Sequence, residues 1–317
     1  MGDQTGRPCP RGAAMSRRIA VLMGGLSAER EVSLTSGAAC AAALRHKGHA
    51  VDELDVGPDL AQRLASLRPE VCFNALHGRL GEDGCVQGLL ELMRLPYTHS
   101  GVRASAVAMH KPTAKELFAH HGLRTPAGRL ATLAEIAAGD VLAPPFVVKP
   151  AAEGSSVGVL VIHDLDDARL RPNTAAGAGA TMLVEPFVAG AELTCAVLDD
   201  KALTVTEIRP REGFYDYRAK YTEGVADHLI PAPVPPAVFE QVLDWSERAH
   251  ALLGCRGVSR ADFRYDPAQG DDGLFILEVN TQPGMTPLSL VPEQAAHCGI
   301  GFADLVERLV EDASCDR

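Results

Sequence analysis

Short apolar segments alternate with a helical segment in the first part of this chain, and this alternation restricts the fold more than any other feature. Residues 18–23 and 71–76 have the pattern of buried β-strands, and residues 50–54 form another strand pattern between them. The alanine-rich residues 36–44 belong to a helix that Ser27 is expected to cap. Strands alternating with helices predict an α/β fold with a parallel, doubly wound sheet, whose ligand site lies at the carboxyl ends of the strands.

The size and charge of the chain exclude several classes of function. Its 317 residues are enough for two or three domains with a large core. The hydrophobic fraction of 46% and the charged fraction of 22% are typical of a soluble globular protein. The formal net charge of -11 argues against a nucleic-acid-binding protein, which usually carries a basic surface. An anionic ligand would therefore need a local cluster of cations, backbone donors or a metal ion.

The cysteine pattern and the N-terminal segment favour a protein of the reducing cytoplasm. None of the eight cysteines forms a C-x-x-C pair, so neither a zinc site nor a thioredoxin-like motif is indicated. No segment approaches the roughly 20 apolar residues of a transmembrane helix. Residues 1–18 contain four arginines but no apolar core, so no secretory signal is expected. We expect a cytoplasmic protein without a membrane partner, in which residues 1–15 form a disordered extension.

An apolar run at residues 274–280 ends in two oxygen-bearing side chains and then breaks at a Pro-Gly pair. Side chains alternate faces along a strand, so Glu278 and Asn280 are expected to point the same way. A carboxylate beside an amide oxygen suits a hard cation such as Mg²⁺, which usually shares its oxygen ligands with substrate phosphates. Taken alone, the pair is more typical of a solvated strand end.

A second charged pair lies on the preceding predicted strand, residues 258–265. Arg260 and Asp262 share one face of that strand. If the strand pairs with the run that ends at Asn280, then Asp262, Glu278 and Asn280 can meet over one site. Such a set could hold two Mg²⁺ ions that bridge the phosphates of ATP, with Arg260 facing developing negative charge. The alternative is a plain surface ion pair.

Two further segments suit the remaining parts of a nucleotide. Lys149 ends a predicted strand, and the glycines and serines of residues 153–158 let backbone N–H groups approach phosphate oxygens. The apolar linker at residues 183–188 could read an adenine edge, and Glu192 could accept the ribose hydroxyls. An ordinary glycine-rich hairpin and an ordinary interdomain hinge are the alternatives. Together these features favour nucleoside triphosphate chemistry.

Six motifs follow one another between residue 18 and the C-terminal region. They lie, in order, at residues 24–33, 77–88, 149–158, 214–221, 260–262 and 278–286. In this combination the chain resembles the D-alanine–D-alanine ligases of the ATP-grasp superfamily. The resemblance implies ATP-dependent joining of two D-alanine molecules through a D-alanyl phosphate. The products would be D-alanyl-D-alanine for peptidoglycan precursors, ADP and phosphate.

The same resemblance implies a three-domain ATP-grasp fold, α/β at the N-terminus and α+β overall, with ATP held between the second and third domains. The N-terminal substrate domain would span residues 16–100 and the central subdomain residues 101–185. The C-terminal subdomain, residues 186–317, would carry the metal site and a lid loop at residues 212–224. A homodimer formed through the N-terminal domain is also implied.

The resemblance further suggests roles for single residues. The nucleotide contacts would be Lys111, Lys149, Glu153, Ser155, Ser156, Glu185, Val188 through its backbone, and Glu192. The ligands of two Mg²⁺ or Mn²⁺ ions would be Asp262, Glu278 and Asn280. The D-alanine contacts would be Glu29, Lys220, Tyr221, Ser289 and the backbone of Leu290. The catalytic groups would be Glu29, Ser155, Tyr221, Arg260 and the backbone N–H of Gly284.

The group that deprotonates the second D-alanine leaves alternatives open. Tyr221 or Ser155 could shuttle the proton, because together with Glu29 they resemble a hydrogen-bonded trio that ties the lid to the site. His77 belongs to the substrate pocket as an alternative base, or else it only orients its own loop.

Two departures from the family pattern and three rival functions bear on this interpretation. Pro186 stands where many relatives carry a lysine beside the adenine, so one side-chain contact to the base is lost, and His110 stands where aspartate is common. A D-alanine–D-lactate ligase is one rival, but that branch generally lacks the equivalent of Tyr221. A non-catalytic nucleotide-binding protein would not need the complete set of metal ligands. A biotin-carboxylase-like activity does not fit the loops at residues 24–33 and 77–84.

Overall fold

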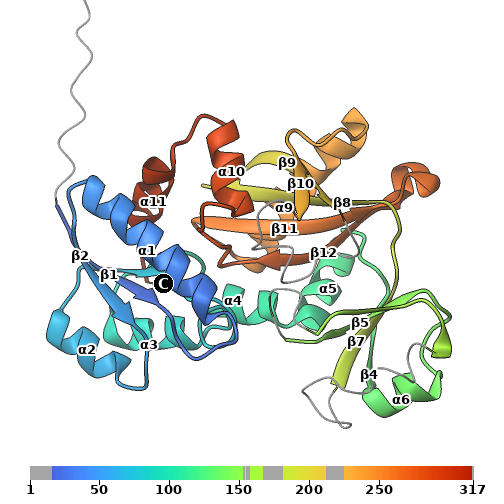
Figure 1. Cartoon of the computed structure of the whole chain (residues 1–317), viewed down its shortest axis with the longest axis horizontal. Helices are drawn as coiled ribbons and strands as arrows, with labels where there is room; N and C mark the ends of the chain where they lie inside the picture. The colour runs from blue at the N-terminus through green and yellow to red at the C-terminus, as the bar shows by residue number, and fades with distance from the viewer. Residues whose placement is uncertain (1–15, 153, 155–157, 167–180, 212–224, 316–317) are drawn as a thin grey trace, which may run out of the picture.

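The named strands β1–β12 of the described residues form three β-sheets. In Figure 1 the sheet that contains β1 lies at the left, the sheet that contains β11 at the upper right, and the sheet that contains β5 at the lower right. The computed structural model describes residues 16–315 except 153, 155–157, 167–180 and 212–224. The extension predicted at residues 1–15 and the lid loop predicted at residues 212–224 lie outside the described residues. Within the described part of the chain, no helix combines the length and the apolar character needed to cross a bilayer.

The N-terminal sheet is parallel and is covered by helices on both faces. Its strands, in spatial order, are β2 (Ala50–Asp55), β1 (Arg18–Met23) and β3 (Val71–Asn74). Its helices are α1 (Arg30–His46), α2 (Leu60–Leu67) and α3 (Cys85–Met93). Ile19 and Val21 of β1 pack in one core with residues of α1, whereas Ala20 and Leu22 pack in another with residues of α2 and α3. This alternation confirms the predicted doubly wound arrangement.

The predicted N-cap of α1 is wrong. The helix begins at Arg30 with Glu29 in the cap position, two residues after Ser27. The Ser27 hydroxyl instead donates to the carbonyl of His77 at 2.7 Å and accepts the N–H of Glu29 at 3.1 Å. Ser27 therefore joins the loop after β1 to the loop after β3, and Glu29 lies at the start of the helix beside that junction.

The four-stranded sheet is antiparallel. Its strands, in spatial order, are β4 (Arg129–Thr132), β7 (Thr181–Pro186), β5 (Phe146–Pro150) and β6 (Leu160–Ile162). Helix α6 (Leu133–Ala138) is capped by Thr132, which forms a capping box with Glu135. Leu133 and Ile136 of this helix pack in a small core with residues of the sheet. This sheet carries Lys149 on β5 and Glu185 on β7.

The five-stranded sheet is also antiparallel. Its strands, in spatial order, are β10 (Ala226–Leu229), β9 (Lys201–Pro210), β8 (Ala191–Leu198), β11 (Val258–Tyr265) and β12 (Leu274–Asn280). Its helices are α9 (Pro236–Leu253), α10 (Leu290–His297) and α11 (Phe302–Glu311), and a 3-10 segment, η1 (Pro267–Gly273), links β11 to β12. Leu305 and Leu309 of α11 pack in the same core as Ile19 of β1, which joins this sheet to the N-terminal unit.

Two helices that lie between β3 and β4 in the sequence pack on the five-stranded sheet and its helix α9. They are α4 (Val102–Met109) and α5 (Lys111–His120). Ala108 of α4 and Phe118 of α5 share a core with Trp245 of α9 and Ile276 of β12. This packing holds the start of α5 beside the ends of β11 and β12, where the candidate site lies. The domain boundaries at residues 100 and 185 stay a prediction.

The pairing of β11 with β12 confirms the geometry on which the predicted metal site depends. The two strands are antiparallel, with Asp262 opposite Glu278 and Arg260 opposite Asn280. The register shifts after Asp262, because Phe263 pairs with Ile276 and residue 277 is the additional residue of a β-bulge.

Candidate active site

Two pockets meet where the sheets approach one another. The first, of about 840 Å³ including its open mouth, lies between β5 and β7 on one side and β11 and β12 on the other. The second lies between the loops that follow β1 and β3 and the end of β12. Lys111, Gly154 and Glu278 line both pockets. The ion pair between Lys111 Nζ and Glu278 Oε2, 3.1 Å long, therefore lies where the pockets join.

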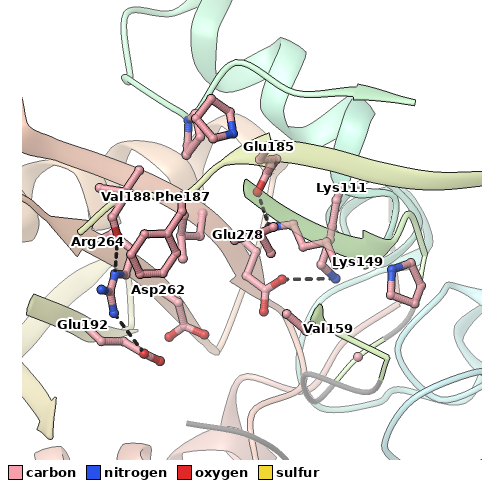
Figure 2. Close-up of a pocket in the computed structure, with 16 residues that line it drawn as sticks. Lys111, Lys149, Val159, Glu185, Phe187, Val188, Glu192, Asp262, Arg264 and Glu278 are labelled. Atoms are coloured by element: carbon pink, nitrogen blue, oxygen red, sulfur yellow. Dashed lines mark hydrogen bonds and ion pairs between the residues drawn. The ribbon is translucent and has the colours of Figure 1, made fainter. Parts of the chain in front are cut away.

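The first pocket combines an apolar region with a cluster of lysines. In Figure 2, Phe187 and Val188 lie at one end and Lys111 and Lys149 at the other. Apolar side chains also line it, including Leu277, the additional residue of the β-bulge on β12. A slot of this kind suits a flat aromatic base that is joined to a chain of phosphates.

Lys149 and Glu185, which line this pocket, belong to a buried cluster that also contains Lys115. Lys149 Nζ lies 2.7 Å from Glu185 Oε2, and Lys115 of α5 pairs with the other carboxylate oxygen. Lys115, Lys149 and Glu185 are 5%, 7% and 2% exposed. Burial lowers the pKa of Lys115 to about 8, against the attraction of Glu185. Burial would raise the pKa of Glu185, but Lys149 and Lys115 outweigh that effect and hold the pKa below its usual value. The cluster therefore carries a net charge of about +1 at neutral pH.

The segment that follows β7 is held by an arginine. Arg264 of β11 donates to the carbonyls of Val188 and Gly190 and pairs with Glu192 Oε2. Figure 2 shows its guanidinium between the ring of Phe187 and the carboxylate of Glu192. Burial lowers the pKa of Arg264, and Glu192 opposes that shift. The segment predicted to read adenine and ribose is thus fixed to the strand that carries Asp262.

Each of the two opposed carboxylates on β11 and β12 has a cationic neighbour. Asp262 accepts two hydrogen bonds from Arg260, at 2.8 and 2.7 Å, and one from the Thr194 hydroxyl at 2.7 Å. Glu278 pairs with Lys111. Asp262 and Glu278 line the first pocket, and Arg260, Glu278 and Asn280 line the second.

The donor set fits a divalent metal ion that also takes ligands from a substrate. Two carboxylates and the amide of Asn280 stand on neighbouring positions of β11 and β12. Asn280 Oδ1 accepts the N–H of Gln282 at 2.8 Å, which fixes the orientation of its amide. Across the described residues, no cluster of three or more His, Cys, Asp and Glu side chains could hold a metal. The site offers few oxygen ligands, and neighbouring cations partly neutralise its carboxylates. Such a site suits Mg²⁺ that also binds substrate phosphates, and not a metal ion that is held by protein ligands alone.

The second pocket contains Glu29 and His77 on adjoining loops. Glu29 is 4% exposed, and a Cβ at Gly78 or Gly154 would lie 3.0 or 2.9 Å from its Oε1. His77 uses both ring nitrogens, with Nδ1 3.3 Å from Glu82 and Nε2 3.2 Å from the Ser36 hydroxyl. These contacts favour the loop-orienting role of His77 over the role of a base.

The start of α10 lies against the loop that follows β12. Ser289, in the cap position, accepts the N–H of Thr286 at 3.0 Å and lies 2.8 Å from the Thr286 hydroxyl. A Cβ at Gly284 would lie 2.8 Å from Ser289 Oγ, so glycine permits this close approach. Leu290 is the first residue of α10, and its buried side chain packs on Ile208. Backbone N–H groups at a helix start suit a carboxylate ligand.

The structure places fourteen of the predicted site residues and leaves five outside the described residues. The five are Glu153, Ser155, Ser156, Lys220 and Tyr221. Sequence reasoning did not single out Lys115, Arg264 or Leu277. Lys115 follows Lys111 by four residues and so shares its helix face, and Arg264 follows Asp262 by two residues on one strand face. Those spacings were the available signals, whereas the bulge that turns Leu277 toward the pocket has no signal in the sequence.

Comparisons with known proteins identify the family of this chain. A family model described as D-ala D-ala ligase C-terminus matches residues 129–311, and one described as D-ala D-ala ligase N-terminus matches residues 56–100. The chain belongs to the D-alanine–D-alanine ligase family. Among curated members of the family, the D-alanine–D-alanine ligase of Cereibacter sphaeroides is 56% identical over 317 residues, 100% of both chains. That of Ruegeria pomeroyi is 57% identical over 95% of this chain and 97% of its own.

Solved structures of ligases from this family share the fold. The D-alanine–D-alanine ligase of Bacillus anthracis matches with a TM-score of 0.80 and 31% identity, over 94% of this chain and 97% of that one. A structure of the Bacillus anthracis enzyme complexed with ATP matches with a TM-score of 0.76 and 30% identity, over 94% and 96% of the two chains. The match confirms the predicted ATP-grasp fold.

Proposed function

We propose that this protein joins two D-alanine molecules in an ATP-dependent reaction and that the D-alanyl-D-alanine serves peptidoglycan synthesis. The observation that carries the proposal is the junction of the two pockets. The nucleotide-shaped pocket opens, at Lys111 and Glu278, into a second pocket that contains Glu29 and Arg260. Phosphoryl transfer from a nucleotide in the first pocket to a carboxylate in the second would take place at that junction.

The first step activates the carboxylate of one D-alanine, which is itself a poor electrophile. Glu29 would bind the ammonium group of this D-alanine, so that its carboxylate lies near Lys111. The carboxylate attacks the γ-phosphate of ATP, forms D-alanyl phosphate and releases ADP. Lys111 and Lys149 would reduce the negative charge on the transferred group. Asp262, Glu278 and Asn280 would hold Mg²⁺ or Mn²⁺, which when bound supplies further neutralisation of the phosphate oxygens.

The second step forms the peptide bond. The amine of the second D-alanine attacks the acyl carbon, and the phosphate leaves from the tetrahedral intermediate. Arg260 and the backbone N–H of Gly284, which both line the second pocket, would stabilise its oxyanion. Ser289 and the N–H of Leu290 would bind the second carboxylate at the start of α10. The roles of Lys220, Tyr221 and Ser155 in binding and proton transfer stay predictions.

The substrate assignment has a direct test. We expect ATP and Mg²⁺ to yield phosphate and dipeptide when D-alanine is supplied, and little of either with L-alanine, D-serine or D-lactate. Phosphate release and mass-spectrometric detection of the product measure this with each substrate in turn. Turnover of L-alanine or D-lactate at the rate seen with D-alanine would exclude the proposed function.

The family resemblance also supports a cytoplasmic homodimer formed through the N-terminal domain. Light scattering of the purified protein would give the mass of a dimer. A monomeric mass at micromolar concentration would contradict this part of the proposal.

The buried lysine cluster predicts a pH dependence of ATP binding. The pKa of Lys115 is about 8, so the proton is lost as the pH rises through that value, and the cluster falls from a net charge of +1 to zero. We expect the KM for ATP to increase from about pH 7 to about pH 9, because Lys149 is then fully neutralised by Glu185. Arginine stays protonated in this range, so Lys115→Arg should keep a nearly constant KM.

The KM for D-alanine provides the control in the same experiment. The KM for D-alanine should have the same pH profile in the wild type and in Lys115→Arg, because Lys115 pairs with Glu185, which lines the first pocket and not the second. If the KM for ATP rises with pH to the same extent in both proteins, the titrating group is not Lys115.

A further inference from the structure

Arg264 holds the segment that follows β7 against the strand that carries Asp262. It lies on β11, two residues after Asp262 and on the same face of the strand. Each of its three guanidinium nitrogens contacts a different part of the segment after β7. Nε lies 3.1 Å from the Val188 carbonyl, Nη2 lies 2.9 Å from the Gly190 carbonyl, and Nη1 lies 3.4 Å from Glu192 Oε2.

Two more contacts fix this segment to the same guanidinium and strand. The guanidinium carbon of Arg264 lies 5.7 Å from the centroid of the Phe187 ring, within cation–π range. At Gly190, an added Cβ would lie 2.1 Å from the Tyr265 carbonyl, so the backbone of the segment touches the end of β11. The pocket residues Phe187, Val188 and Glu192 are thereby held in register with the strand that carries Asp262.

Charge explains why an arginine stands at this place. A carboxylate such as Glu192 in a nucleotide pocket repels a triphosphate, and its long side chain has several rotamers to lose on binding. Arg264 offsets the charge and restricts the side chain, while its other nitrogens hold two backbone carbonyls. A lysine would have one nitrogen at the end of a flexible stem and could not hold all three acceptors at once.

We propose that Arg264 is a positioning residue that sets the specificity of the nucleotide pocket for an intact ribose. The proposal rests on ATP as the substrate of this pocket. Arg264 orients Glu192 toward the ribose hydroxyls and fixes the Val188 backbone at the base. The sequence departure at Pro186, which removes a lysine contact to the base, increases the share of nucleotide binding that depends on this arginine.

The test compares ATP with 2′-deoxy-ATP and 3′-deoxy-ATP in the wild type, Arg264→Met, Arg264→Lys and Glu192→Gln. We expect Arg264→Met to raise the KM for ATP about tenfold, the effect of losing one charge-assisted hydrogen bond, with kcat reduced less than about threefold. The KM for at least one deoxynucleotide should rise much less, so that the variant no longer distinguishes it from ATP. Glu192→Gln should show the same loss of discrimination, and Arg264→Lys an intermediate one.

A merely structural arginine gives a different pattern. In that case Arg264→Met raises the KM for ATP and for both deoxynucleotides by one common factor, and the proposal fails. It also fails if Glu192→Gln retains full discrimination, a result that can be obtained even when the arginine variants do not fold. Failure of the proposed function can be distinguished from failure of the Arg264 proposal. If the proposed function is wrong, the wild type itself shows no D-alanine-dependent phosphate release with ATP.

Discussion

Replacing Glu278 by glutamine is expected to lower kcat by about a hundredfold or more, the loss of roughly 3 kcal/mol of transition-state stabilisation. Glu278 lines both pockets, stands opposite Asp262 and pairs with Lys111 at 3.1 Å. Glutamine keeps the volume but removes one of the two negative charges proposed to hold the metal ions. Because the side chain is 26% exposed and lies outside the cores, the melting temperature should change by only a few degrees.

A second carboxylate of the first pocket provides a matched control. Glu192→Gln makes the same chemical change near the opposite end of that pocket, so it should raise the KM for ATP and leave kcat largely intact. Turnover at saturating ATP and D-alanine over a range of Mg²⁺ concentrations separates the two variants. A near-normal kcat of Glu278→Gln at high Mg²⁺ would exclude Glu278 as an essential ligand.

The ion pair with Lys111 offers a competing explanation that can be tested in the same assay. If Glu278 acted only by holding Lys111, Lys111→Met would produce the same defect, and the double variant would be no worse than either single one. Under the metal-ligand role, only the Glu278 variant should require more Mg²⁺ for half-maximal activity.

The strands could be predicted closely because their signal is local. Residues 258–265 and 274–280 alternate buried and partly exposed side chains along most of their length, and the structure gives the predicted bounds for β11 and β12. The strand period puts Arg260 with Asp262, and Glu278 with Asn280, on one face of their strands, so the carboxylates could meet if the two strands paired. The pairing itself, and the β-bulge at residue 277 that sets Asp262 opposite Glu278, are supplied by the structure.

Features that depend on distant contacts could not be predicted. Ser27 has the residue type and position of an N-cap, but its hydroxyl bonds to the carbonyl of His77, fifty residues away. Glu185 was assigned to the nucleotide, and the structure shows that its carboxylate is paired with Lys115 and Lys149 inside the protein. A charged residue in a helix pattern is usually exposed, so the burial of Lys115 becomes evident only once α5 is placed against the four-stranded sheet.

Arg260→Met is expected to lower kcat by about a hundredfold while the affinity for ATP changes little. The side chain lines the second pocket beside Gly284 and does not line the first. Loss of one charged donor to the oxyanion corresponds to roughly 3 kcal/mol. The unbranched stem of methionine preserves most of the packing, which limits any loss of stability.

The bidentate pair of Arg260 with Asp262 supplies a rival explanation. The guanidinium lies 2.8 and 2.7 Å from the two carboxylate oxygens, so its loss could release a proposed metal ligand instead of removing an oxyanion donor. Thr194, 2.7 Å from Asp262 Oδ1, would still hold that carboxylate in part. Under the rival, high Mg²⁺ should restore the rate of Arg260→Met, whereas a missing oxyanion donor cannot be replaced by free Mg²⁺.

Arg264→Met is the matched control because it removes an arginine from the same face of the same strand, four residues away. Calorimetry should show normal ATP affinity for Arg260→Met and weakened affinity for Arg264→Met, and the turnover numbers should show the reverse order. A general disturbance of β11 would affect both variants in the same way, so each variant controls for it in the other. A large loss of ATP affinity in Arg260→Met, with turnover at saturation preserved, would mean that Arg260 binds the phosphates of ATP before the reaction. Arg260 would then not stabilise the oxyanion, and the Gly284 N–H would be its remaining proposed donor.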